Sequence, residues 1–122
     1  MWYPDKDLII KVHELMLKLY GGYPGFERGI DAYDSILEEA KEAEGVYRKA
    51  AILLRRIVRA RIFQDANHRT AQIITELFLK KNNAEMATKE PQVVIKFIKD
   101  ILRYNIDEIE EWLKNGTLPK RR

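Results

Sequence analysis

The stretch Ala60-Arg61-Ile62-Phe63-Gln64-Asp65-Ala66-Asn67-His68-Arg69-Thr70-Ala71 joins two long apolar segments, and it decides how the chain folds. A pattern of apolar residues at helical spacing enters this stretch, and a second such pattern leaves it. Between them lies a short polar turn, residues 64–67, which contains no bulky side chain. The sequence therefore predicts a helix, a tight turn and a second helix.

The predicted turn has the components of an anion site. The first N–H groups of a helix have no partner within it and, together with the helix dipole, they attract anions. Arg69 lies in the first turn of the second helix, and its guanidinium matches the oxygens of a phosphate. Asp65 supplies a carboxylate for a hard cation such as Mg²⁺. These groups together predict a cradle for the phosphates of a nucleotide.

The same residue types have a simpler use. Asp and Asn are favoured at helix N-caps and in turns. From the residues alone, Asp65 and Asn67 are better explained as residues that only begin the second helix.

A family resemblance changes this balance. The stretch resembles the signature loop of the Fic/Doc family, and most closely its Doc (death on curing) branch, in which the pattern is His-x-Phe-x-Asp/Glu-Gly/Ala-Asn-Gly/Lys-Arg. The chain departs from the pattern at Arg61, which replaces His, and at His68, which replaces Gly or Lys. The positions that agree are Phe63, Asp65, Ala66, Asn67 and Arg69, followed by Thr70-Ala71 as in the Doc branch.

The resemblance extends to both ends of the chain. Leu19-Tyr20-Gly21-Gly22 followed by Pro24-Gly25 is typical of Doc-like chains, and so is the late pair Trp112-Leu113. The resemblance therefore covers nearly the whole chain and implies a Fic-like fold, a compact all-α bundle.

The resemblance implies a transferase that uses ATP and Mg²⁺. Most Fic enzymes transfer adenylate to a protein hydroxyl, whereas the Doc branch acts as a protein kinase on a translation elongation factor and halts protein synthesis. By resemblance, Asp65 holds the metal, Asn67 fixes the loop and touches phosphate, and Arg69 clamps the phosphate charge. The N–H groups from Ala66 to Arg69 form the anion hole, and His68 donates to phosphate as a weaker, pH-dependent cation than Lys.

Arg61 occupies the position of the family's general base. A general base must be unprotonated near neutral pH, and arginine is not. Loss of a general base costs about 10²- to 10⁴-fold in rate, so we expect reduced or absent activity with an intact phosphate site. Three explanations stay open: a natural pseudo-enzyme, a copy inactivated by one His-to-Arg change, or a phosphoryl transfer that needs little help from a base.

The resemblance also implies how the activity is restrained. Family members that restrain themselves carry the pattern Ser/Thr-x-x-x-Glu-Gly/Asn. Ser35 and Glu39 have this spacing, but Ala40 follows them. We therefore expect the restraint to come from a separate antitoxin protein.

Composition limits the partners further. The net charge is only +3, so nucleic acid is not an expected partner, although basic residues concentrate between Arg48 and Arg69. Arg48 and Lys49 are expected on the solvent face of a helix. The absence of cysteine excludes disulfides and zinc–thiolate sites and is compatible with the cytoplasm, where we expect the protein to act. No apolar run approaches the roughly 20 residues of a membrane span.

Two other function classes remain open. The first is a non-catalytic module that binds a nucleotide or a protein. The second is a helix-turn-helix DNA binder, because two helices joined by a short turn carry many arginines. We rank DNA binding last because only His68, Arg69 and Gln72 offer polar side chains at the start of the second helix.

Apolar spacing over the whole chain predicts one all-α domain, residues 1–122, with about six helices. Asp5 is the expected N-cap of the first helix and Thr88 that of the fifth. His13, within the first helix, is expected at the surface or the core edge. The predicted helices cover residues 6–20, 29–41, 47–63, 67–81, a segment from Thr88 to about Leu102, and residues 106–114.

Overall fold

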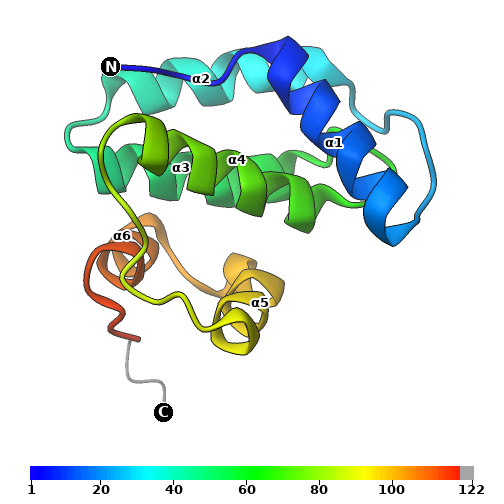
Figure 1. The fold of residues 1–122 in the computed structure, drawn as a ribbon. Coiled ribbons are helices and arrows are strands. Elements are labelled where there is room, and N and C mark those ends of the chain that lie inside the picture. Colours follow the sequence, from blue (N-terminus) through cyan, green and yellow to red (C-terminus); the bar gives the residue numbers. More distant parts are fainter. Residues whose placement is uncertain (119–122) are drawn as a thin grey trace.

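The computed structural model describes residues 1–118, and the regular elements in this part of the chain are all helices (Figure 1). The elements in chain order are α1 (Lys6–Tyr20), the 3₁₀ helix η1 (Ile30–Ala32), α2 (Tyr33–Glu42), α3 (Val46–Ala60), α4 (Asn67–Lys81), α5 (Pro91–Lys99), the 3₁₀ helix η2 (Ile101–Arg103) and α6 (Ile106–Asn115). The predicted all-α fold class with about six helices is therefore confirmed. No helix in this part of the chain is long and apolar enough to cross a membrane.

Helix α3 lies at the centre of the molecule and packs against α2, α4 and α6. Figure 1 shows α3 and α4 side by side, with α1 crossing near the start of α4 and α5 and α6 on the other side. Ala50 and Ala51 have no exposed surface, so neighbouring helices can approach the backbone of α3 closely. Leu53, Leu54 and Ile57 fill the space around them and supply much of the hydrophobic stabilisation.

The observed ends of α1 and α4 agree with the ends predicted from the sequence. The carboxylate of Asp5 accepts a hydrogen bond from the backbone N–H of Leu8 at 2.8 Å, as expected of an N-cap. Gly21 ends α1 with φ 80°, a conformation that suits glycine. Helix α4 has the predicted bounds, residues 67–81. These two helices pack together and position the loop at the start of α4.

Helix α3 ends earlier than predicted. It stops at Ala60, and Arg61 takes a left-handed conformation with φ 50° and ψ 53°. The chain from residue 61 to 64 is instead held by the loop between α1 and η1, here called the α1–η1 loop (residues 21–29). Glu27 N–H donates to the carbonyl of Ile62 at 2.9 Å, and Gln64 N–H donates to the carbonyl of Gly25 at 3.0 Å. Long-range pairing therefore ends the helix, although the apolar pattern continues.

The second half of the chain differs from the prediction in its caps. Thr88 does not cap α5, which has Glu90 at the N-cap position and Pro91 as its first residue. Helix α5 ends at Lys99 and is followed by η2. Helix α6 begins with a capping box that we did not predict, in which Asn105 and Glu108 exchange side-chain and backbone hydrogen bonds.

The expected position of Lys49 is wrong. Its side chain is buried, and Nζ donates to the carbonyls of Ala40 and Lys41 at 3.0 Å each. These carbonyls lie in the last turn of α2, where a cation satisfies them and complements the helix dipole. Arg48, in contrast, is partly exposed and forms ion pairs with Asp107 and Glu110 of α6.

Candidate functional site

The loop between α3 and α4, here called the α3–α4 loop (residues 61–66), pairs with the α1–η1 loop. Phe26 and Phe63 form an isolated antiparallel bridge, and their rings stack with centroids 5.4 Å apart. Arg28 N–H donates to the carbonyl of Arg61 at 3.0 Å. Phe63 is buried. The path by which the chain leaves α3 is therefore fixed by residues more than thirty positions earlier.

Asn67 closes the α3–α4 loop from its other end. Its side-chain oxygen accepts from Phe63 N–H at 3.1 Å, and its Nδ2 donates to the Phe63 carbonyl at 2.8 Å. Asn67 is also the first residue of α4. In the structure, the Asn67 side chain thus holds the loop through the backbone of Phe63. Its contact with phosphate stays a prediction.

Asp65 is held by two backbone amides. One carboxylate oxygen accepts from Tyr23 N–H at 3.1 Å, and the other accepts from its neighbour Ala66 N–H at 2.8 Å. The Tyr23 and Ala66 amides hold the pKa of Asp65 below its usual value, and the charge of Arg69 acts in the same direction. Asp65 is therefore ionised at neutral pH.

The start of α4 has three backbone donors without an intrahelical acceptor. Ala66 lies in the left-handed region with φ 61°, and its carbonyl accepts from both the N–H and the hydroxyl of Thr70, at 3.0 and 2.8 Å. Thr70 makes the first intrahelical bond, so the amides of Asn67, His68 and Arg69 precede the hydrogen-bond ladder. We call these the first-turn amides of α4. They are the donors that a helix offers to an anion.

A cavity of about 500 Å³ is lined in part by His68 and Arg69, two of the three residues that carry the first-turn amides. The Arg69 guanidinium lies over the ring of Tyr20, with Cζ 4.8 Å from the ring centroid. Partial burial of the ring lowers the pKa of His68 below its usual value, so the neutral form predominates at pH 7. The cavity is lined by Met16, Tyr20, His68, Arg69, Gln72, Ile73, Ile95, Ile98 and Lys99. Its volume and its combination of apolar walls with polar side chains are those of a small-molecule site.

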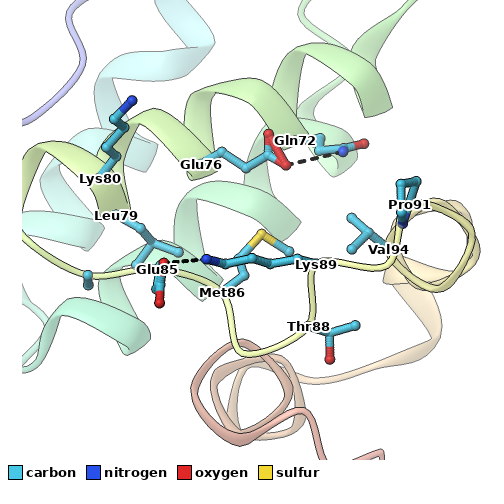
Figure 2. A pocket seen from close by; sticks show the side chains of 11 residues that line it. Gln72, Glu76, Leu79, Lys80, Glu85, Met86, Thr88, Lys89, Pro91 and Val94 are labelled. Atoms are coloured by element: carbon cyan, nitrogen blue, oxygen red, sulfur yellow. Dashed lines mark hydrogen bonds and ion pairs between the residues drawn. The ribbon is translucent and has the colours of Figure 1, made fainter.

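A second cavity of about 430 Å³ lies along the middle and the C-terminal half of α4 (Figure 2). Gln72 lines both cavities. In the second one, Gln72 Nε2 donates to Glu76 Oε1 at 3.3 Å, and Lys89 forms an ion pair with Glu85 at 2.5 Å. Because these polar groups are paired with each other and the lining of this cavity includes none of residues 67–69, we assign the candidate site to the first cavity.

Arg61 lies outside the lining of the first cavity. Its guanidinium is exposed, and Nε donates to a carboxylate oxygen of Glu27 at 2.5 Å. The hydrogen bond to Glu27 and its negative charge raise the pKa of Arg61, so the group stays protonated. The position at which the family pattern has a base therefore holds a cation paired with an acid.

The structure thus brings together two of the predicted residues, His68 and Arg69, on one cavity wall. Asp65, Ala66 and Asn67 shape the loop next to it. Within residues 1–118 no group of three or more His, Asp or Glu side chains is arranged to hold a metal ion. One carboxylate, that of Asp65, is too few ligands to hold Mg²⁺ by itself. It could bind a Mg²⁺ ion that is already coordinated by the phosphate oxygens of a nucleotide.

The sequence analysis missed one residue of the site, His13. Only 4% of it is exposed, although we expected it at the surface or the core edge. Its ring stacks on Phe63 with centroids 3.6 Å apart and planes 4° apart, and its Nε2–H donates to the Asp65 carbonyl at 3.0 Å. The available signal was helical spacing, because His13 follows buried Ile9 by four positions and precedes buried Met16 by three.

The chain matches a known protein family. The model of the Fic/DOC family matches residues 3–79, which include α1 and the α3–α4 loop and extend almost to the end of α4. No curated protein matches the chain.

Proposed function

The chain belongs to the Fic/DOC family, and from this premise we propose that it is a Doc-like toxin of a toxin–antitoxin pair. In this proposal it transfers phosphate or adenylate from ATP to a hydroxyl of a target protein, such as a translation elongation factor in the cytoplasm. The rate of transfer is low because Arg61 replaces the family's catalytic His. The first-turn amides of α4 bind the phosphates, and Arg69 neutralises their charge.

One observation carries this proposal: the first-turn amides, Arg69 and the 500 Å³ cavity lie together at the start of α4. An anion bound to the amides meets the helix dipole and a guanidinium. The apolar cavity walls beside it offer space for the nucleoside. Asp65, ionised and held by two amides, adds a carboxylate for a Mg²⁺ ion bound to the nucleotide; that ion would supply charge neutralisation of the phosphates.

Arg61 determines the expected rate. Its guanidinium cannot accept the proton of the attacking hydroxyl, and the pair with Glu27 keeps it charged. Positioning and electrostatic stabilisation supply most of the catalysis of phosphoryl transfer. The phosphate-binding groups should therefore still accelerate the transfer when the general base is absent. We expect a rate about 10²- to 10⁴-fold below that of a variant with a base at this position.

Restraint by a separate antitoxin belongs to the same proposal. The partial pattern from Ser35 to Glu39 lies on α2, and Ala40, which replaces the expected Gly or Asn, is fully buried in the core. The small side chain of Ala40 is therefore explained by packing in the core. The chain is thus expected to need a protein partner for inhibition.

The test combines binding with labelling. ATP with Mg²⁺ is titrated by calorimetry into the native chain and into Arg61→His, and each is then incubated with purified elongation factor and ATP labelled at the α or γ phosphate. Binding by both forms and a labelled band from Arg61→His is the expected result. A γ label identifies phosphate transfer and an α label identifies adenylate transfer. Failure of both forms to bind ATP overturns the proposal.

A second candidate is a non-catalytic nucleotide-binding module. The Arg61–Glu27 ion pair favours it, because a paired cation takes the position of the base. This candidate predicts that Arg61→His binds ATP and labels nothing. DNA binding is disfavoured because α4, the would-be recognition helix, packs against α1, α3 and α5.

A further inference from the structure

We propose that His13 is a positioning residue for nucleotide binding, which holds the α3–α4 loop so that the first-turn amides of α4 face the phosphates. This inference rests on the proposed function of the same loop. His13 comes from α1, contacts Phe63 and Asp65 of the loop, and does not line the cavity, so it acts through other groups and not on the nucleotide itself.

The first step of the argument is that His13 makes two different contacts with the loop. Its ring lies parallel to the ring of Phe63 at 3.6 Å, and its Nε2 lies 3.0 Å from the carbonyl oxygen of Asp65. Because a carbonyl can only accept, His13 is the donor and carries its proton on Nε2. An apolar side chain could supply the packing but not the hydrogen bond.

The second step concerns the peptide unit between Asp65 and Ala66. Its carbonyl accepts from His13, and its N–H donates to the carboxylate of Asp65 at 2.8 Å. Both polar groups of this one peptide are therefore engaged, and they fix the orientation of its plane. A planar peptide with both ends held leaves little freedom in the direction of the chain that follows.

The third step links this peptide to the anion donors. Ala66 follows directly and has φ 61°, a conformation that a residue other than glycine adopts at a cost. The next three residues carry the first-turn amides. If the peptide between Asp65 and Ala66 rotated, Ala66 could return to a favourable conformation, and the three amides would point elsewhere. His13 therefore stabilises the strained conformation that directs the donors.

Two substitutions separate the hydrogen bond from the packing. His13→Phe keeps an aromatic ring next to Phe63 and removes the donor, whereas His13→Gln places an amide N–H near the former Nε2 and removes the ring. His13→Met is a second donor-free variant, whose flexible side chain fills irregular space. Leu15→Ala, on the exposed side of α1, is the matched control.

Two readouts are measured on each folded variant: the dissociation constant of ATP with Mg²⁺ by calorimetry, and the backbone order parameters of residues 64–69 by NMR relaxation. We expect donor-free variants to bind ATP about tenfold more weakly, the effect of one lost hydrogen bond, and to show lower order parameters in the loop. His13→Gln should recover most of the affinity lost in His13→Phe, which a merely structural role in packing would not produce.

The outcomes are distinguishable from failure of the proposed function. If the native chain does not bind ATP, the proposed function fails, and the order parameters alone decide whether His13 holds the loop. If His13→Phe or His13→Met folds, binds ATP as the native chain does and keeps an ordered loop, the inference about His13 is overturned. If His13→Gln is as weak as His13→Phe, the hydrogen bond is not the responsible contact, and the inference is likewise overturned.

Discussion

Asn67 directs both hydrogen-bonding groups of its side-chain amide to the backbone of a single residue, Phe63. The two residues are four positions apart, one at the end of the segment held by the α1–η1 loop and the other at the start of α4. The amide therefore clamps the ends of the turn that contains Asp65. Both the geometry of the α3–α4 loop and the binding of a nucleotide should therefore depend on the side chain of Asn67.

Replacement of Asn67 tests the clamp. Asn67→Ala removes two hydrogen bonds, so we expect the free energy of unfolding to fall by about 1–3 kcal/mol and the affinity for ATP to fall as well. Gln64→Ala is the control from the same loop, because Gln64 is exposed and its one side-chain hydrogen bond is long, 3.4 Å. Urea unfolding should show less than about 0.5 kcal/mol for the control. Equal stability of the two variants would contradict the clamp.

The stability of the chain should depend on the ionisation of Asp65. The amides of Tyr23 and Ala66 lower the pKa of Asp65 in the folded state, so the folded state binds its proton less readily than the unfolded chain does. This contribution is fully present above the unfolded pKa, about 3.9, and is lost as the pH falls through the lower folded pKa. Asp65→Asn should thus be less stable than the native chain at pH 7, and the difference should shrink below about pH 4.

Urea titrations of both proteins from pH 3 to pH 7 measure this difference. The carboxylate accepts from two amides, whereas the Asn side chain has one oxygen acceptor and presents an NH₂ group to the second amide. A difference that stays constant over the whole range would show that the charge of Asp65 does not contribute.

Lys49 offers a prediction about the fold alone. Lys49→Met keeps an apolar stem but leaves the carbonyls of Ala40 and Lys41 without their donor. We expect a loss of about 1–3 kcal/mol in the free energy of unfolding, the cost of leaving buried acceptors unsatisfied. Lys11→Met, at an exposed position of α1, should change it by less than about 0.5 kcal/mol. Chemical denaturation of the two variants decides the matter.

The sequence predicted those parts of the fold that depend on local signals. The bounds of α4 and the cap at Asp5 follow from apolar spacing and from the preference of Asp for helix starts. The end of α3 could not be predicted in this way, because Ile62 and Phe63 continue the apolar pattern beyond the last helical residue. Both are buried, but in a segment whose backbone pairs with residues 25–29, and a pairing between distant segments leaves no periodic trace in the sequence.

The residues of the candidate site likewise fall into those that local sequence signals predict and those that depend on distant partners. Arg69 and the first-turn amides could be proposed from the turn and the helix start. The role of His13 could not, because its partner Asp65 is 52 positions away and a lone His on a helix has no specific signature. The burial of Lys49 was missed for a similar reason, since its acceptors are the carbonyls that end another helix.

Gly22 gives the most direct test of how the α1–η1 loop supports the site. A Cβ at this position would lie 2.9 Å from Oδ2 of Asp65 and 2.9 Å from Cδ2 of Leu17. Gly22→Ala must therefore displace the carboxylate, and we expect weaker ATP binding in the presence of Mg²⁺. Gly21→Ala is the matched control, because Gly21 also has a positive φ, 80°, but a Cβ there would contact nothing within 4 Å.

Both alanine variants have the backbone strain of a side chain at positive φ, so both should lose stability in thermal unfolding. Only Gly22→Ala pushes against Asp65, and only it should lose additional affinity for ATP when the two are compared by calorimetry at a temperature where both are folded. If Gly21→Ala weakens binding as much as Gly22→Ala does, strain in the α1–η1 loop is the cause. The close approach of Gly22 to Asp65 would then have no part in holding the carboxylate at the site.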